Sequence, residues 1–316
     1  MPLMLGYYLC ERMITFLYLL FKIMKTIPLK IVFYVPLYWN KITRIMIKDI
    51  IIRVLCVFTI PMLISCDEIF DVHPYDVNIK GETHINESNM NKIERLCKDK
   101  DTLKIAFISD THGWYSDFKD EVADINKHKD IDFVIHCGDI TDTGTTKEYE
   151  WARSIFDKLN VLHVTLIGNH DFLGTGDQAY HVMFGDNDFS FIAGRVKFVC
   201  LNTNATEYDY LASVPNFDFM ENEQKSRSSD FDRTIIVMHA RPGSEQFNNN
   251  VSKAFNYFVH LFPGIMFCIS GHEHATQAAE LFNDKLMWYG VDCAQHRKYD
   301  LFTITKEGYK YEVVNF

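Results

Sequence analysis

The chain has 316 residues, of which 47% are hydrophobic and 23% are charged, as in ordinary globular proteins. This length suffices for one large α/β domain or two smaller ones. The formal net charge of −10 argues against a nucleic-acid-binding surface. The eight cysteines contain no CxxC pair, so the sequence offers no zinc-ribbon or thioredoxin-type motif.

The first 65 residues differ in charge from the rest of the chain. They contain eight Lys and Arg and two Asp and Glu, which leaves 32 − 8 = 24 basic and 42 − 2 = 40 acidic residues for the remainder. Lys48 and Arg53 precede an apolar stretch over residues 54–65, an arrangement typical of a secretory signal and too short for a membrane span. We expect residues 1–65 to be a signal or leader region, with Met46 as a candidate for the true start.

The segment Leu63-Ile64-Ser65-Cys66 resembles the lipobox of bacterial lipoproteins, in which cleavage leaves a lipidated cysteine at the new N-terminus. This resemblance implies a lipidated Cys66, a membrane anchor and an extracytoplasmic location at a bacterial envelope. A buried helix that happens to end at Cys66 is the alternative. Residues 66–100 are polar, and we expect this lipidated N-terminus to continue as a linker with one short helix over residues 91–97.

From residue 101 onward, strand patterns and helix patterns alternate. Apolar runs predict strands over residues 103–109, 131–136 and 161–167, and apolar residues at helical spacing predict helices over residues 118–128 and 146–159. This order indicates βαβ units that feed a mostly parallel sheet. Further strands are predicted at residues 196–201, 234–238, 265–269, 286–291, 301–305 and 309–314. We expect one α/β domain over residues 101–316, with two sheets packed face to face and helices outside.

Polar side chains follow five of these strands at their carboxyl ends, where ligand sites form in α/β sheets. Residues at positions i and i+2 of an extended segment point to the same side, so His272 and His274 are expected to address one place. The residues at the five strand ends are, in chain order, Asp110, His112, Asp139, Asn169, His170, Asp171, His239, His272 and His274.

This set combines imidazole, carboxylate and amide groups and lacks a thiolate. Zinc, iron and manganese ions accept imidazole nitrogen together with carboxylate oxygen, whereas Ca²⁺ and Mg²⁺ prefer oxygen ligands alone. The absence of cysteine argues against a structural zinc site. Seven ligands are too many for one catalytic ion with an open position, but they divide into two sets of four if one carboxylate bridges. The seven are Asp110, His112, Asp139, Asn169, His239, His272 and His274.

Five motifs resemble, in the same order, those of the calcineurin-like metallophosphoesterases, over residues 104–276. The resemblance implies a four-layer α/β/β/α sandwich of two mixed sheets flanked by helices. It also implies hydrolysis of phosphate esters by a hydroxide that bridges two metal ions. The five motifs are Asp110-x-His112, Gly138-Asp139, Gly168-Asn169-His170-Asp171, His239 and Gly271-His272-x-His274.

The resemblance assigns a role to each site residue. It implies that Asp139 bridges the two ions and that His170 stabilises the transition state or protonates the leaving oxygen, with Asp171 orienting the His170 ring. The first ion would also be held by Asp110, His112 and His274, and the second by Asn169, His239 and His272. The expected cofactors are two divalent or trivalent ions of Fe, Mn, Zn or Co, because the ligand types suit all four metals.

Two cations at such a site can activate water near neutral pH and neutralise phosphoryl oxygens, so the expected substrate is a small phosphate ester. Because every ligand position is filled, an enzyme is favoured. A phosphodiesterase acting on nucleotides or phospholipid headgroups is the main alternative, and a non-catalytic binding protein on the same fold is a further one. Candidate supporting residues are Arg241 for phosphate, Asp142 for the ligands, and Trp114, Tyr115, Phe172 and Phe247 as pocket walls.

Overall fold

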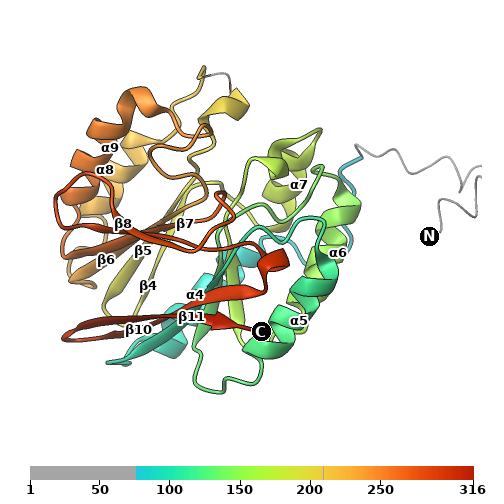
Figure 1. Ribbon diagram of the computed structural model, residues 1–316, viewed down its shortest axis with the longest axis horizontal. Coiled ribbons are helices and arrows are strands. Elements are labelled where there is room, and N and C mark those ends of the chain that lie inside the picture. The colour runs from blue at the N-terminus through green and yellow to red at the C-terminus, as the bar shows by residue number, and fades with distance from the viewer. Residues whose placement is uncertain (1–75, 209) are drawn as a thin grey trace, which may run out of the picture. The chain divides into compact units, whose positions relative to one another are not determined.

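The computed structural model describes residues 76–316 with the exception of residue 209, and Figure 1 shows their arrangement. The predicted signal region, Met46 and Cys66 lie outside the described residues. No helix in the described part of the chain is both long enough and apolar enough to cross a membrane.

The described chain forms two mixed β-sheets. In the first sheet β1, β2 and β3 are parallel, while β10 and β11 are antiparallel additions at one edge. Its order is β11 (Gly308–Asn315), β10 (Lys298–Thr305), β1 (Leu103–Ile108), β2 (Phe133–His136) and β3 (Leu162–Thr165). The second sheet has the order β4 (Phe189–Ala193), β5 (Val196–Leu201), β6 (Arg233–Met238), β7 (Ile265–Ser270), β9 (Met287–Gly290) and β8 (Gln277–Glu280).

The side chains of each central strand alternate between two apolar cores. In β1, Ile105 and Phe107 lie in the core between the sheets, whereas Ala106 and Ile108 face the helices outside. This alternation follows from the two-residue period of a β-strand. Strands with both faces buried are therefore apolar throughout, which is why their sequence runs were recognisable.

Helices cover the outer face of each sheet, so the predicted four-layer α/β/β/α sandwich is confirmed (Figure 1). Helix α6 (Thr146–Phe156) begins with a capping box in which the Thr145 side chain and the Glu148 side chain bond each other's backbone N–H. The first sheet is covered by α5 (Tyr115–Ile125), α6 (Thr146–Phe156) and α7 (Gly176–Met183), and the second by α8 (Phe217–Lys225) and α9 (Ser252–His260).

The segment predicted as a polar linker contains a longer helix than expected. Helix α4 (Ile85–Cys97) has 13 residues and begins six positions before the predicted helix over residues 91–97. Ile93 and Cys97 enter the core between the sheets, and the Asn86 side chain bonds both the backbone N–H and the carbonyl of Thr165 in β3. This part of the segment is therefore packed against the sheets. The sequence did not predict the full helix, because some residues on its buried face are polar.

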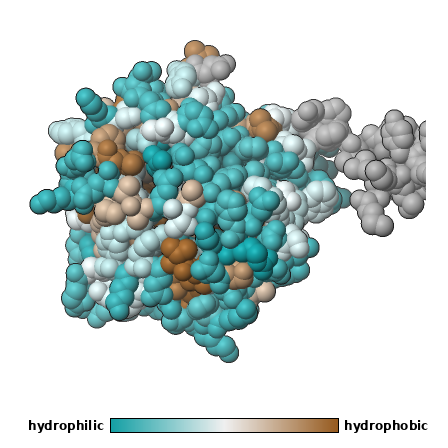
Figure 2. Space-filling view, in the orientation of Figure 1, coloured by the Kyte–Doolittle hydropathy of each residue, from teal (hydrophilic) through white to brown (hydrophobic). Residues whose placement is uncertain are grey.

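Strands β4 and β8 and helices α7, α8 and α9 were not predicted. Strand β8 lies at the sheet edge with its middle residues exposed, so it carries no apolar alternation. The visible face of the molecule is mostly hydrophilic, and its apolar side chains lie in small separate patches (Figure 2). A surface helix such as α8, whose buried residue is Met220, has few apolar residues facing the core. Its helical spacing of apolar residues is therefore hard to detect in a short stretch of sequence.

We predict that Asn86→Ala lowers the free energy of unfolding by about 1–3 kcal/mol, because it leaves the buried backbone N–H of Thr165 without a partner, whereas the Thr165 carbonyl still accepts a hydrogen bond from the Tyr180 hydroxyl. Urea unfolding of the purified protein measures the change. Asn91→Ala on the exposed face of the same helix is the control, with an expected change below about 0.5 kcal/mol. Equal small effects of the two substitutions would show that α4 contributes little to the stability of the sheets.

Candidate metal centre

The structure brings all seven predicted ligands together where the carboxyl edges of the two sheets meet. Strands β1, β2 and β3 of the first sheet deliver Asp110, His112, Asp139 and Asn169, and strands β6 and β7 of the second sheet deliver His239, His272 and His274. Because parallel strands end at the same edge, ligands separated by up to 164 positions (274 − 110) become neighbours.

Four of these ligands adopt a backbone conformation that residues with a side chain rarely use. The φ angles of Asp110, Asp139, His272 and His274 are 51°, 57°, 71° and 46°, all in the left-handed region. Such a conformation costs about 1–3 kcal/mol at a non-glycine residue and persists where the surrounding structure requires it. Here it turns the chain immediately after the strand and places the side chains at the sheet edge.

Two glycines allow the backbone to approach the carboxylates closely. A Cβ atom added at Gly168 would lie 2.2 Å from Oδ1 of Asp139, and one added at Gly271 would lie 2.8 Å from Oδ2 of Asp110. Any side chain at either position would displace a predicted ligand. These contacts explain why the glycine before Asn169 and the glycine before His272 belong to the motifs.

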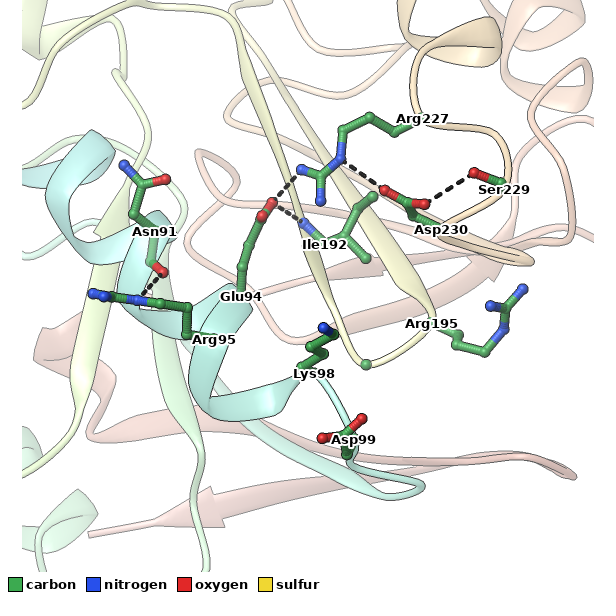
Figure 3. A pocket seen from close by; sticks show the side chains of 11 residues that line it. Asn91, Glu94, Arg95, Lys98, Asp99, Ile192, Arg195, Arg227, Ser229 and Asp230 are labelled. Carbon is green, nitrogen blue, oxygen red and sulfur yellow. Dashed lines mark hydrogen bonds and ion pairs between the residues drawn. The ribbon is translucent and has the colours of Figure 1, made fainter.

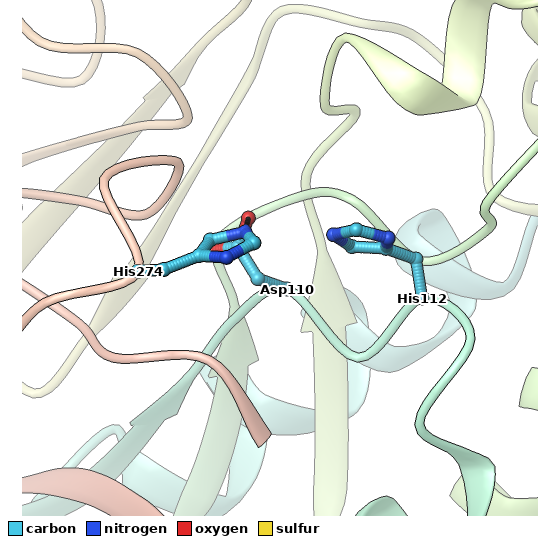
Figure 4. A group of neighbouring side chains, drawn as sticks. All are labelled: Asp110, His112 and His274. Atoms are coloured by element: carbon cyan, nitrogen blue, oxygen red, sulfur yellow. Dashed lines mark ion pairs between the residues drawn. The ribbon is translucent and has the colours of Figure 1, made fainter. Parts of the chain in front are cut away.

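Asp110, His112 and His274 form the first ligand set, and Figure 4 shows their side chains pointing toward one another. The Nε2 atom of His274 lies 3.2 Å from Oδ1 of Asp110. Nε2 of His112 is buried and has no hydrogen-bond partner. A buried polar atom without a partner is costly in a folded protein, so this nitrogen is oriented as a cation would require.

Asp139, His239 and His272 form the second set, together with the Asn169 side chain. Oδ1 of Asn169 lies 3.0 Å from Nε2 of His239 and 3.0 Å from Nδ1 of His272. Oδ2 of Asp139 lies 3.4 Å from Nε2 of His239 and 3.9 Å from Nε2 of His112. One carboxylate oxygen therefore faces both ligand sets, which is the arrangement expected of a bridge.

In three of the ligands, the imidazole nitrogen that points away from the centre contacts an acceptor. Nδ1 of His112 lies 3.3 Å from a carboxylate oxygen of Asp142, and Nδ1 of His239 lies 2.9 Å from the carbonyl oxygen of Cys137. Nε2 of His272 lies 2.9 Å from a carboxylate oxygen of Glu245. Since these oxygens only accept, the outer nitrogens carry hydrogen and the inner nitrogens present lone pairs.

The ionised side chains of the centre also favour the binding of cations. Burial opposes ionisation of Asp110, yet the hydrogen bond from His274 and the charge of His239 hold the pKa of Asp110 well below its usual range. Burial would lower the pKa of His239, but Asp139 raises it to about 9, and the hydrogen bond to Asp110 raises the pKa of His274 to about 10. The buried carboxylates thus stabilise positive charge at these positions, and metal ions can supply that charge in place of protons.

His170 lies beside the first ligand set without joining it. Its ring stacks on that of His112 with a centroid distance of 4.5 Å and an interplanar angle of 22°. Its Nδ1 lies 2.9 Å from the carbonyl oxygen of Asp142, so Nδ1 carries hydrogen and Nε2 is left to exchange a proton with a ligand. This position suits a general acid or base.

The predicted orientation of His170 by Asp171 is wrong. The Asp171 carboxylate is fully buried and instead accepts hydrogen bonds from the backbone N–H groups of Ile140, Thr141 and Gly168 and from the Thr141 hydroxyl. Burial and the charge of Asp139 raise the pKa of Asp171 to about 7. Asp171 therefore ties the loop after β2 to the loop after β3, and the Asp142 carbonyl takes the orienting role.

Some of the other candidate residues contact the centre, and others do not. Asp142 supports both His112 and His170 as described above, and Trp114 contacts the rings of His112 and His274. Phe247 belongs to the core under α9 and does not line the centre. Glu245 was missed, because a lone glutamate in the polar stretch after His239 has nothing in sequence to distinguish it.

One cavity in the described chain lies away from this centre. It has a volume of about 950 Å³ and lies at the opposite end of the strands, between α4, the β4–β5 turn and the segment after α8 (Figure 3). Charged side chains there pair with one another, as Arg227 does with Glu94 and Asp230. Its lining includes neither unpartnered buried polar atoms nor the predicted ligands, so the chemistry is assigned to the strand ends.

Residues 103–276 match the family model of the calcineurin-like phosphoesterases. The chain belongs to this family. Family membership agrees with the ligand geometry, since calcineurin-like phosphoesterases use a dinuclear metal centre and the two ligand sets joined at Asp139 fit such a centre. The protein is thus a metal-dependent phosphoester hydrolase.

Three known proteins are similar to this calcineurin-like phosphoesterase. A 3′,5′-cyclic-nucleotide phosphodiesterase of Nostoc sp. is 26% identical over 187 residues, covering 56% of this chain and 69% of the relative. A probable cyclic nucleotide phosphodiesterase of Fibrobacter succinogenes is 29% identical over 98 residues, covering 28% of this chain and 38% of the relative. The solved structure of a dimetal phosphatase from Danio rerio shares the fold, with a TM-score of 0.51 and 12% identity over 68% of this chain and 99% of that chain.

We predict that His170→Ala lowers turnover of a phosphate ester by about two to four orders of magnitude, the usual contribution of a proton-transferring group. The metal content should stay at the wild-type level, because His170 groups with His112 and Asp142 and belongs to neither of the two sets that meet at Asp139. Steady-state kinetics and elemental analysis check the two expectations, with His181→Ala on the exposed surface as the control. Loss of bound metal in His170→Ala would place His170 among the ligands.

Proposed function

We propose that this calcineurin-like phosphoesterase is a phosphodiesterase for small nucleotide-like diesters. The observation that carries the proposal is the pair of ligand sets joined at Oδ2 of Asp139. Two bound cations would supply a water nucleophile at neutral pH and neutralise the phosphoryl oxygens. His170 would give a proton to the leaving oxygen from Nε2, since the Asp142 carbonyl occupies its Nδ1.

The charge around the centre favours a diester over a monoester. Asp142, Glu245 and Glu273 form its rim together with Arg241, whose guanidinium lies 3.9 Å from the Glu273 carboxylate. The Asp142 and Glu245 side chains are 54% and 78% exposed, so both face approaching solutes. A monoester carries up to two negative charges at neutral pH and a diester one, and each extra charge near a rim carboxylate costs about 1 kcal/mol in water.

Two of the similar proteins favour the same substrate class. Both are cyclic nucleotide phosphodiesterases, one of them described as probable. A cyclic nucleotide is a diester with a single charge and an aromatic base. We therefore place small nucleotide diesters first among the phosphoesters that this centre would hydrolyse.

We predict that kcat/KM for bis-p-nitrophenyl phosphate and 3′,5′-cyclic AMP exceeds that for p-nitrophenyl phosphate by about tenfold or more, as the charge argument requires. Glu245→Gln should narrow the difference, because it removes a rim charge and keeps an acceptor for His272. The assay uses the purified protein loaded in turn with Mn²⁺, Zn²⁺, Co²⁺ or Fe²⁺. A wild-type preference for the monoester would contradict the proposal.

We also propose that Cys66 carries a lipid that anchors the protein to a bacterial envelope membrane, outside the cytoplasm. The proposal is supported by the basic residues Lys48 and Arg53, the apolar stretch over residues 54–65, and the segment Leu63–Cys66 at the end of that stretch. Such an anchor would hold the metal centre in the extracytoplasmic space, where phosphoesters from outside the cell are available.

For the anchor, mass spectrometry of the native protein should find Cys66 as an acylated N-terminus, and Cys66→Ser should shift the protein from the membrane fraction to the soluble fraction. Cys97→Ser is the matched control, because Cys97 is buried in the folded domain. A mature peptide that spans Ser65 and Cys66 would refute lipidation.

A further inference from the structure

The loop between β1 and α5 places a tryptophan against the metal centre. The Trp114 ring lies 4.9 Å from the ring of His112 and 5.5 Å from that of His274, measured between centroids. These two imidazoles come from different sheets and both belong to the first ligand set (Figure 4). Trp114 thus lies within reach of the organic part of a small ester whose phosphate is bound at the ligands.

The space next to this loop is open. Gly113 precedes Trp114 with a φ of 72°, and a Cβ added at Gly113 would have no atom within 4 Å. Trp114 itself is half-buried, so part of its ring contacts the ligands and part faces solvent. An exposed aromatic surface beside a polar centre is unfavourable in water unless a ligand covers it.

The neighbouring aromatic residues are placed differently. Tyr115 packs edge-on against Trp151 with a centroid distance of 5.8 Å, and Phe172 packs against Tyr208 at 5.3 Å. Phe247 lies in the core. Trp114 is therefore the member of the predicted aromatic set whose ring contacts are made with metal ligands.

We propose that Trp114 is a specificity-determining residue that stacks on the planar aromatic group carried by the substrate, a nucleobase or an aryl ring. The metal ligands bind the phosphate common to all phosphoesters, and the indole selects among them by the organic group. This inference rests on the proposed phosphodiesterase function. Stacking suits the site because every base has a π-face, so no precise hydrogen-bond geometry is needed.

The test compares substrates that share one diester and differ in the aromatic group. The substrates are 3′,5′-cyclic AMP and 1-deoxyribose 3,5-cyclic phosphate, which keeps the cyclic diester and lacks the base. Trp114→Ala should raise KM for 3′,5′-cyclic AMP about 5- to 100-fold, the usual effect of losing one stacking aromatic residue. KM for the base-free diester, kcat for both substrates and the metal content should stay near wild type.

Two further variants separate stacking from structural support of the ligands. Trp114→Phe keeps a π-face and should restore most of the affinity, whereas Trp114→Leu keeps apolar packing against His112 and His274 and should not. Trp151→Ala, on a partly exposed tryptophan of α6, is the control and should leave both KM values unchanged.

Each outcome decides the matter. If Trp114→Ala lowers kcat and metal content for both substrates, Trp114 supports the ligands and the inference is overturned. If the variant hydrolyses both substrates like wild type, the inference is overturned and the proposed function stands. If the metal-loaded wild type prefers p-nitrophenyl phosphate or hydrolyses no diester, the proposed function itself fails.

Discussion

The burial of two carboxylates, Asp110 and Asp139, at the meeting edge of two sheets is the constraint on which the rest of this structure depends. Removing an ionised carboxylate from water costs several kcal/mol unless positive charge and hydrogen bonds offset the loss. Histidines from the second sheet surround both groups, and Oδ2 of Asp139 faces both ligand sets. Bound cations would offset this cost more completely than protons, which couples the stability of the edge to metal binding.

The same constraint accounts for the strained backbone around the centre. Four ligands have left-handed φ angles, and glycines at positions 168 and 271 stand where a Cβ would strike a carboxylate. Asp171 adds a fixed connection, because its carboxylate accepts hydrogen bonds from the loops after β2 and β3. The strain is sustained by two sheets whose central strands are buried on both faces, since a rigid edge leaves these loops little freedom to relax.

The buried strands and the polar residues that follow them were predictable, because an apolar sequence run marks a strand and parallel strands end at the same edge of a sheet. An apolar run followed by Asp or His indicates both a strand and its carboxyl end, so the candidate ligands after β1, β2, β3, β6 and β7 could be proposed from sequence. The orienting partner of His170 could not, because a backbone carbonyl such as that of Asp142 leaves no trace in a sequence, whereas the adjacent Asp171 does. Helix α4 was underestimated for a related reason, since its buried face includes Asn86 and Asn89, whose polarity is satisfied by β3.

The centre and its rim follow different physical requirements. The ligands must bind cations and phosphate, so their residue types can be recognised in a sequence. These residue types indicate the class of reaction. The residues around the centre contact only the rest of the substrate. Glu245 and Trp114 can make such contacts from loops, whose sequences vary more than those of strands. Glu245 and Trp114 each also contact a predicted ligand, Glu245 through Nε2 of His272 and Trp114 through the ring of His112. A substitution of either residue can therefore act on substrate choice or on ligand support, and the comparison of KM with metal content distinguishes the two effects.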